Sequence, residues 1–160
     1  MSAVLFRCDG GPELGIGHVM RCSALAAAFG ALGWRSAFAV TRESAPLVSG
    51  REVVIVPPGR EGASVVAATC SAEDFEILVV DHYGLDAAFE GAARGAAALV
   101  VVIDDLADRA HDCDVLLDPN PERAPADYDR LVSRETRLLL GLKHASLRAE
   151  FHERDRKSVV

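Results

Sequence analysis

A glycine-rich segment near the start of the chain carries the sharpest chemical pattern in the sequence. It reads Cys8-Asp9-Gly10-Gly11-Pro12-Glu13-Leu14-Gly15-Ile16-Gly17-His18 and runs directly into a predicted helix over His18–Leu32. Such a turn exposes backbone N–H groups at the positive end of a helix, which suits phosphate or a polar sugar. As a dinucleotide or P-loop fingerprint it is incomplete, because Met20 replaces the third glycine and no lysine follows. Glycines that serve only a tight turn are the alternative.

His18 stands in the first turn of that predicted helix. A helix N-terminus disfavours a charged imidazole, so we expect a neutral histidine that can accept a proton as a general base. A histidine that caps its own helix or packs against a sheet is the alternative. Arg21 follows one turn later and is expected to form an ion pair, either with Asp9 or with an acid at a strand end. Met20 and Cys22 are expected to face the core.

Further polar side chains come directly after predicted strands. They are Asp81, His82, Tyr83, Asp104, Asp105, Asp118 and Asn120. The carboxyl ends of parallel strands meet at one edge of a sheet, where ligands of α/β folds bind, so these residues are candidates for one site. Helix capping explains any one of these acids equally well.

Two metal sites are further alternatives. One would use the strand-end residues Asp81, His82, Asp104 and Asp105, although such acids also occur in metal-free α/β clefts. The other would use His111-x-Cys113, which has no companion pair of ligands. We expect no metal and no cofactor.

Short β-branched runs alternate with Ala-rich stretches along the chain. The predicted strands are Ala3–Cys8, Ser36–Val40, Val53–Val56, Ile77–Asp81, Ala98–Asp104, Val115–Asp118 and Arg137–Leu140, and the predicted helices are His18–Leu32, Gly62–Ser71 and Leu85–Arg94. In the last helix, Leu85, Phe89 and Ala92 would share one face. Continuous apolar strands are typical of a parallel sheet that is covered on both faces. The sequence therefore predicts an α/β, Rossmann-like three-layer sandwich with right-handed crossovers.

Composition bounds the function further. The chain has 160 residues, 50% of them hydrophobic, with 17 Lys and Arg against 24 Asp and Glu. A net charge of −7 argues against nucleic acid or an anionic membrane as a partner. No apolar stretch is long enough for a membrane span and no leader pattern opens the chain, so we expect a cytoplasmic protein. The four scattered cysteines predict reduced, mostly buried thiols.

Four ordered motifs resemble a known family. They are Arg7-x-Asp9 with Gly15-Ile16-Gly17-His18-Val19-Met20-Arg21-Cys22; Val80-Asp81-His82-Tyr83-Gly84-Leu85-Asp86; Ile103-Asp104-Asp105-Leu106-Ala107-Asp108-Arg109 with His111-x-Cys113-Asp114 and Asp118; and Leu140-Gly141-Leu142-Lys143-His144-Ala145-Ser146-Leu147-Arg148-x-Glu150-Phe151. The pattern is similar to that of the UDP-diacetamido-trideoxy-sugar hydrolases of pseudaminic acid biosynthesis and related spore-coat polysaccharide proteins. Pro119 departs from it, because the family usually has Gln there.

The resemblance implies a GT-B fold, in which two Rossmann-like domains flank a cleft. Residues 1–150 would be the N-terminal domain and residues 151–160 the start of an interdomain helix or linker. The C-terminal domain, which holds most of the UDP in the family, would be absent and would have to act in cis or in trans.

The resemblance also implies the chemistry. His18 would activate water for inverting attack on the anomeric carbon of a UDP-linked 2,4-diacetamido-2,4,6-trideoxyhexose. Tyr83, which lines the sugar site, would be the second catalytic residue. The residues expected to bind substrate are Asp9, Gly15, Ile16, Gly17, Arg21, Asp81, His82 and Asp105. A non-catalytic sugar- or nucleotide-binding module and the N-terminal half of an inverting UDP-sugar glycosyltransferase remain as alternatives.

Overall fold

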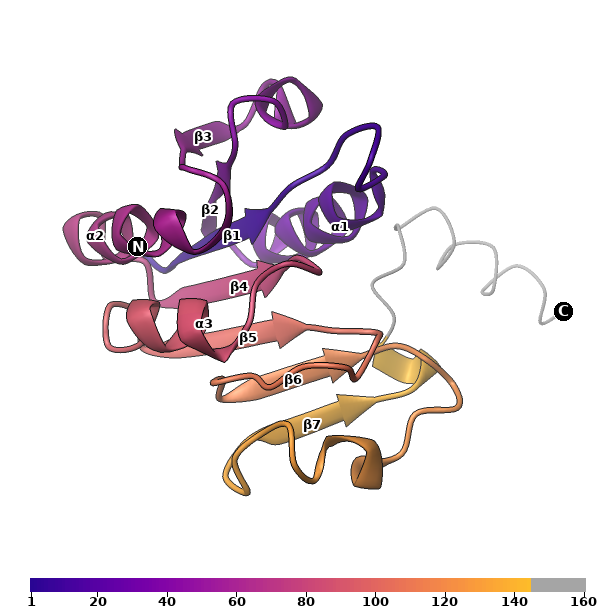
Figure 1. Cartoon of the computed structure of the whole chain (residues 1–160). Coiled ribbons are helices and arrows are strands. Elements are labelled where there is room, and N and C mark those ends of the chain that lie inside the picture. Colours follow the sequence, from indigo (N-terminus) through magenta and orange to yellow (C-terminus); the bar gives the residue numbers. More distant parts are fainter. Residues whose placement is uncertain (145–160) are drawn as a thin grey trace, which may run out of the picture.

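A seven-stranded sheet forms the centre of the structure, a computed structural model that describes residues 1–144 (Figure 1). All of its strand pairs are parallel. The strands are β1 (Ala3–Cys8), β2 (Arg35–Val40), β3 (Glu52–Ile55), β4 (Ile77–Asp81), β5 (Leu99–Ile103), β6 (Val115–Asp118) and β7 (Arg137–Leu140). The helices are α1 (Gly17–Ala31), α2 (Ala63–Ala72) and α3 (Ala87–Ala93), and short 3-10 helices occur at η1 (Ala45–Val48), η2 (Gly59–Gly62), η3 (Pro125–Tyr128) and η4 (Leu142–His144).

In the strand order β3-β2-β1-β4-β5-β6-β7, successive strands are added on one side of β1 up to β3 and on its other side from β4 onward. The chain builds outward from β1 to β2 and β3, and then returns to place β4 on the other side of β1. A crevice opens at the carboxyl ends of the strands at such a switch point. The register pairs Cys8 with Asp81 there, so the glycine-rich loop after β1 lies beside the loop after β4.

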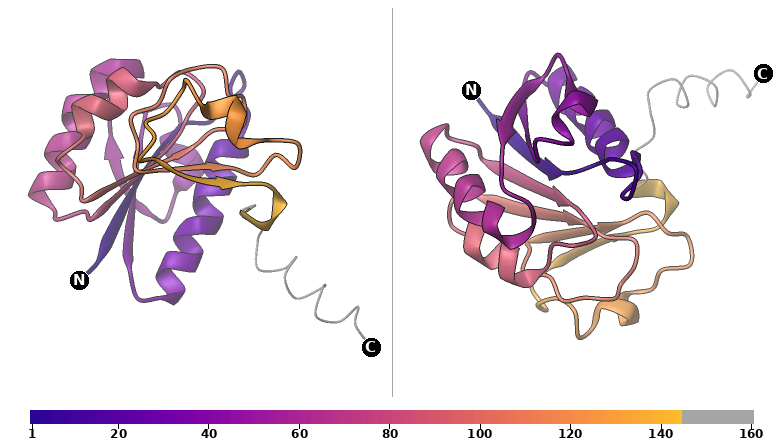
Figure 2. Two further views of the ribbon diagram at one scale, coloured as in Figure 1. Left: turned by 90° about the horizontal axis from the view of Figure 1, so that it is seen from below. Right: turned by 45° about the horizontal axis from the view of Figure 1, so that its top comes forward.

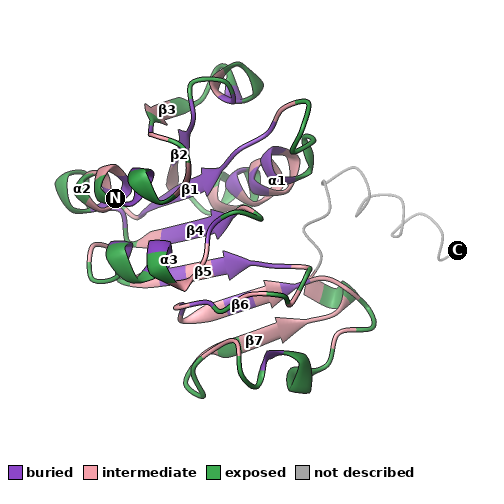
Figure 3. Cartoon of the chain, in the orientation of Figure 1, coloured by how far each residue is buried: buried purple, intermediate pink, exposed green. Residues whose placement is uncertain are grey.

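The sheet is covered on both faces, as the continuous apolar strands predict. Helix α1 packs on one face, and α2 and α3 pack on the other (Figure 2). The α1 side of the core is built around Phe6 and Phe38, whose rings stack with centroids 5.2 Å apart. The central strands β1, β2 and β4 are buried almost throughout, whereas β7 at the edge is half-buried (Figure 3). The α/β three-layer prediction is confirmed.

The predicted strands all form: β1, β4, β6 and β7 have the predicted bounds, and β2, β3 and β5 differ from theirs by one residue at one or both ends. The third helix is the main departure. It begins at Ala87, because the Asp86 carboxylate caps it by accepting the N–H of Ala88 at 3.1 Å. Leu85 therefore precedes the helix. Ala92, predicted to share a face with Leu85 and Phe89, is exposed, whereas those two residues and Ala93 are buried.

All four cysteines are free and buried, which confirms the thiol prediction. Within residues 1–144, no helix combines the length and apolarity of a membrane span. The predicted domain boundary at 150 and the interdomain helix at 151–160 lie outside the described residues.

Candidate active site

The loop after β1 turns back on itself before α1 begins. Gly11 and Gly15 exchange backbone hydrogen bonds of 2.9 and 2.7 Å, and Gly15 takes a φ of +72° that favours glycine. At Gly10 a Cβ would lie 3.0 Å from the carbonyl oxygen of Gly15, so the loop also needs a glycine for close packing. No side chain of residues 1–144 caps α1, so the N–H groups of its first turn have no capping partner among them.

His18 lies in the first turn of α1, as predicted, and contacts the last residue of β4. Its Nδ1 is 2.6 Å from Asp81 Oδ1, and both side chains are buried. Because an ionised carboxylate only accepts hydrogen bonds, Nδ1 donates and the remaining lone pair of a neutral ring is on Nε2. Nε2 has no hydrogen-bond partner among the described residues. The helix-capping alternative is wrong, because no side chain caps α1.

Arg21 joins two strand-end acids to the same cluster. Its Nε and Nη2 donate to the two oxygens of Asp81, both at 2.7 Å, and its Nη1 donates to Asp105 Oδ2 at 2.8 Å. Burial alone would lower the pKa of Arg21, but the carboxylates of Asp81 and Asp105 outweigh burial and raise it. The predicted ion pair is therefore formed with strand-end acids and not with Asp9.

A small pocket of about 160 Å³ opens over this cluster. Its lining residues are Leu14, Gly17, His18, Arg21, Tyr83 and Asp105. The Tyr83 ring meets the His18 ring edge-on, with centroids 4.4 Å apart, and 42% of the residue is exposed. Burial and the nearby Asp105 carboxylate raise the pKa of Tyr83, so its hydroxyl is a neutral donor at pH 7. Asp105 Oδ1 is buried and has no hydrogen-bond partner in the described part of the chain.

A larger pocket of about 430 Å³ adjoins the first across Leu14. It lies over the carboxyl ends of the strands between the glycine-rich loop and the segments after β2 and β3, and its lining includes Asp9, Glu13, Glu43 and His82. No Lys or Arg of residues 1–144 lines it. This pocket is therefore better suited to a neutral or cationic group than to phosphate.

His82 is an uncharged side chain that lines the larger pocket. Its Nδ1 accepts the N–H of Gly84 at 2.9 Å, and its Nε2 lies 3.5 Å from Asp9 Oδ2. Burial and the neighbouring Arg7 guanidinium lower the pKa of His82 to about 4, so the ring is uncharged at pH 7. Asp9 is engaged with Arg7 at 2.7 Å and with Thr41 at 2.7 and 2.9 Å.

The strand-end acids of the metal alternatives are occupied by protein donors. Asp81 is held by His18 and Arg21, and Asp104 accepts backbone N–H groups and the side chains of Arg109 and Tyr128. Among residues 1–144, no group of three or more His, Cys, Asp or Glu side chains is arranged to hold a metal ion.

The predicted site residues thus divide between two adjoining pockets. Gly17, His18, Arg21, Tyr83 and Asp105 line the smaller one, with Asp81 beneath them, and Asp9 and His82 line the larger one. Gly15 and Ile16 lie in the loop between β1 and α1.

Sequence reasoning missed a buried polar network behind the pocket. It consists of Glu90, Asp104, His111, Asp118 and Tyr128. Asp118, predicted as a site candidate, belongs to this network, where Tyr128 donates to it at 2.8 Å. The available signal was Glu90, a charged residue between the buried Phe89 and Ala93 of a short apolar helix.

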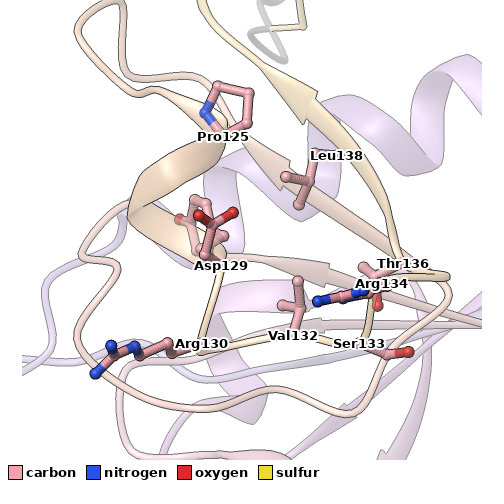
Figure 4. Close-up of a pocket in the computed structure, with 9 residues that line it drawn as sticks. Pro125, Asp129, Arg130, Val132, Ser133, Arg134, Thr136 and Leu138 are labelled. Carbon is pink, nitrogen blue, oxygen red and sulfur yellow. The ribbon is translucent and has the colours of Figure 1, made fainter.

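A third pocket lies elsewhere in the described part of the chain. It measures about 500 Å³, is bounded by η3, the following loop and β7, and is lined by Arg130, Arg134 and Leu138 among others (Figure 4). None of the predicted site residues lines it.

The fold and the site together define a Rossmann-like α/β domain with a histidine–carboxylate pair at the topological switch point. No protein-family profile matches the chain. The chain is similar to the UDP-2,4-diacetamido-2,4,6-trideoxy-beta-L-altropyranose hydrolase of Campylobacter jejuni, with 27% identity over 150 residues. The match covers 94% of this chain and 53% of that protein, so the chain spans about half the length of its relative. The chain is thus a distant homologue of a UDP-sugar hydrolase, which agrees with the resemblance seen in its motifs.

Proposed function

We propose that this chain is the base-bearing half of a nucleotide-sugar hydrolase. The substrate class is a UDP-linked 2,4-diacetamido-2,4,6-trideoxyhexose, and the products are the free sugar and UDP. The observation that carries the proposal is the His18–Asp81 pair, which leaves Nε2 unpaired beside a pocket at the switch point of a chain similar to a UDP-sugar hydrolase.

In this proposal His18 acts on a water molecule in the smaller pocket. Nε2 takes a proton from the water as the water oxygen bonds to the anomeric carbon from the face opposite the diphosphate. The bond between that carbon and the phosphate oxygen breaks, and its electron pair leaves with UDP, so the configuration inverts. Asp81 orients the ring and stabilises the imidazolium that forms. Arg21 holds Asp81 in place through two hydrogen bonds.

Tyr83 and Asp105 would orient the sugar. The Tyr83 hydroxyl is a donor at pH 7, and the Asp105 carboxylate is an acceptor that lines the same pocket. Both side chains line the pocket beside His18. Fixing the anomeric carbon within reach of the activated water is where much of the rate enhancement of such a reaction arises.

The charge of the two pockets supports a diphosphate site on another half of the enzyme. Arg21 is the one cation that lines the smaller pocket within residues 1–144, and it is already paired with two carboxylates. The surrounding loops expose Leu14, Ile16 and Leu106 by 39%, 57% and 44%. Apolar side chains exposed around a polar site suit a covering domain. We therefore propose that a C-terminal GT-B domain, in cis or in trans, supplies the UDP site.

One observation favours the glycosyltransferase alternative. The larger pocket next to the base has room for more than water, and an acceptor hydroxyl placed there would lose its proton to His18 and attack the anomeric carbon in place of water, with UDP leaving. The product distinguishes the two reactions, because transfer yields a glycoside and hydrolysis yields a free sugar.

Calorimetry with UDP, followed by a product assay on the UDP-sugar, tests the proposal. We expect this chain alone to bind UDP with a Kd of about 1 mM or weaker and to turn over negligibly, since closure and positioning can account for ~10²-fold in rate or more. Micromolar UDP binding or rapid turnover by the chain alone would show that the nucleotide site lies on this half, and would contradict the proposal.

A further inference from the structure

Arg109 bridges the two loops that form neighbouring walls of the smaller pocket. Its Nε donates to the carbonyl of Leu85 at 2.8 Å, and its Nη2 donates to the carbonyl of His82 at 3.1 Å. These two carbonyls bracket Tyr83 in the loop after β4. The same guanidinium donates through Nη1 to Asp104 Oδ1 at 3.1 Å, at the end of β5 and directly before Asp105.

Asp104, the contact of Arg109 in the loop after β5, is itself held by several hydrogen bonds. Its carboxylate accepts the N–H groups of Leu106 at 3.2 Å and Ala107 at 2.9 Å, and the hydroxyl of Tyr128 at 3.0 Å. These bonds hold Ala107 at a φ of +54°, a conformation that side chains rarely adopt. The Asp104 carboxylate therefore fixes the turn that carries Asp105. Arg109 links this turn to the neighbouring loop, which carries Tyr83.

The Tyr83 loop has few other attachments. Within it, Gly84 donates to its neighbour His82, and the bond from Leu85 N–H to the His82 carbonyl is long, at 3.4 Å. Beyond Tyr83, Ala87 N–H bonds to the carbonyl of Ala110 at 2.9 Å, next to Arg109 in the chain. Apart from the His82–Asp9 contact, the Arg60–Asp86 ion pair and the packing of Tyr83 on His18, the links from this loop to the rest of residues 1–144 pass through Arg109 or the residue after it.

We propose that Arg109 is a positioning residue that fixes Tyr83 relative to His18 and Asp105. It touches neither substrate nor the reacting atoms, since its donors are directed at Asp104, Asp108 and the two carbonyls. Its catalytic meaning rests on the proposed function. The placement of Tyr83 is a property of the folded chain and can be measured without substrate.

The chain contains two tyrosines, so labelling with 3-fluorotyrosine gives two fluorine resonances, and Tyr83→Phe assigns them. In the wild type, His18→Asn should shift the Tyr83 resonance, because the two rings are 4.4 Å apart. Arg109→Gln should move the Tyr83 resonance and reduce its response to His18→Asn by roughly half or more, as a double-mutant cycle measures. Arg109→Lys keeps the charge but cannot reach both carbonyls and Asp104, so it should restore only part of the response.

Arg35→Gln is the matched control. Arg35 also pairs with carboxylates, Glu52 and Glu73, and also donates to a carbonyl, but at the amino end of β2, at the opposite edge of the sheet. It should leave the Tyr83 resonance unchanged. If Arg109→Gln fails to fold, Arg109→Lys takes its place with the same readouts.

An unmoved Tyr83 resonance with a full response to His18→Asn in a folded Arg109 variant would overturn the proposal. So would an equal change caused by Arg35→Gln. A Tyr83 resonance that moves as expected, in a protein whose completed form never hydrolyses a UDP-sugar, would retain the positioning role and reject the proposed function.

Discussion

Two histidines of this molecule each contact a carboxylate through Nδ1, but one lines a pocket and the other is sealed in the interior. His18 Nδ1 lies 2.6 Å from Asp81, and His111 Nδ1 lies 2.7 Å from Glu90. His18 lines a pocket at the switch point, whereas the His111 side chain is fully buried, with Nε2 3.7 Å from Asp104 and no hydrogen bond there. A histidine–carboxylate pair can serve as a base beside an open pocket and as a structural cation in a sealed one.

Neighbouring charges reinforce this difference. Burial alone would lower the pKa of His111, but the carboxylates of Asp104 and Glu90 raise it to about 9, so the ring is charged at pH 7. In the pocket, Arg21 already supplies the positive charge that Asp81 requires, through two hydrogen bonds of 2.7 Å. Asp81 therefore does not depend on His18 as its counter-ion.

The largest expected difference between the roles of the two histidines comes from replacing His18, the one that lines the pocket. His18→Asn should leave the fold intact and lower turnover of the completed enzyme by ~10²-fold or more, because a lost general base typically has this effect. Turnover by the variant at the wild-type rate would contradict the role of His18 as the base.

Removing the sealed ring should affect stability instead. His111→Asn leaves Glu90 buried without its cation and Asp104 paired with Arg109 alone, which should cost about 3 kcal/mol of unfolding free energy. Urea denaturation at pH 7 measures the loss, with His18→Asn as the matched control. A loss below about 1 kcal/mol would show that the ring is not needed as a buried cation.

The same contrast has a pH dependence. Because folding raises the pKa of His111 from 6.5 to about 9, its contribution is complete below pH 6.5 and is lost as the pH rises through about 9. Buried thiols such as Cys70 and Cys113 have raised pKa values and also weaken the fold at high pH. The measurement is therefore the difference in unfolding free energy between wild type and His111→Asn, which should shrink from pH 6.5 to pH 9.5. A constant difference would mean that His111 is not charged in the fold.

Substitutions at Ala107, in the turn after β5, should change the unfolding free energy by less than the loss of His111. Ala107→Gly relieves the φ of +54° but frees the unfolded chain, so stability should change by less than about 1 kcal/mol in either direction. Ala107→Val should be clearly destabilising, since a β-branched side chain disfavours this conformation. Thermal unfolding of the two variants compares them directly, and equal stability would contradict the fixed turn.

Removal of metal should have no effect on the pocket. In the described part of the chain, its carboxylates bind Arg21 and His18. In the proposed function, backbone N–H groups and a second domain stabilise the negative charge of the leaving UDP. EDTA should leave hydrolysis by the completed enzyme unchanged. Activity that is lost with EDTA and restored by Mg²⁺ or Mn²⁺ would make Asp81, Asp104 and Asp105 ligands.

The elements of this fold could be predicted because parallel strands appear in sequence as continuous apolar runs. The limits of α3 were wrong because apolar spacing ran back to Leu85, while the cap at Asp86 sets the start. The sequence placed His18, Arg21 and the strand-end acids at one edge, but it could not pair them. His18 and Asp81 are 63 residues apart and meet through the register that aligns Cys8 with Asp81. Asp104 and Asp118 resemble site acids in sequence, and only their buried partners show a structural role.

The most direct test of the central claim follows the oxygen atom of water. The UDP-2,4-diacetamido-2,4,6-trideoxyhexose would be incubated in water labelled with oxygen-18, using this chain fused to the part of the Campylobacter jejuni relative that it does not match. Mass spectrometry should find the label in the free sugar and none in UDP, and the His18→Asn fusion should form neither product at a comparable rate. Label in a phosphate product, or equal turnover by the His18→Asn fusion, would contradict attack on the anomeric carbon by water that His18 activates.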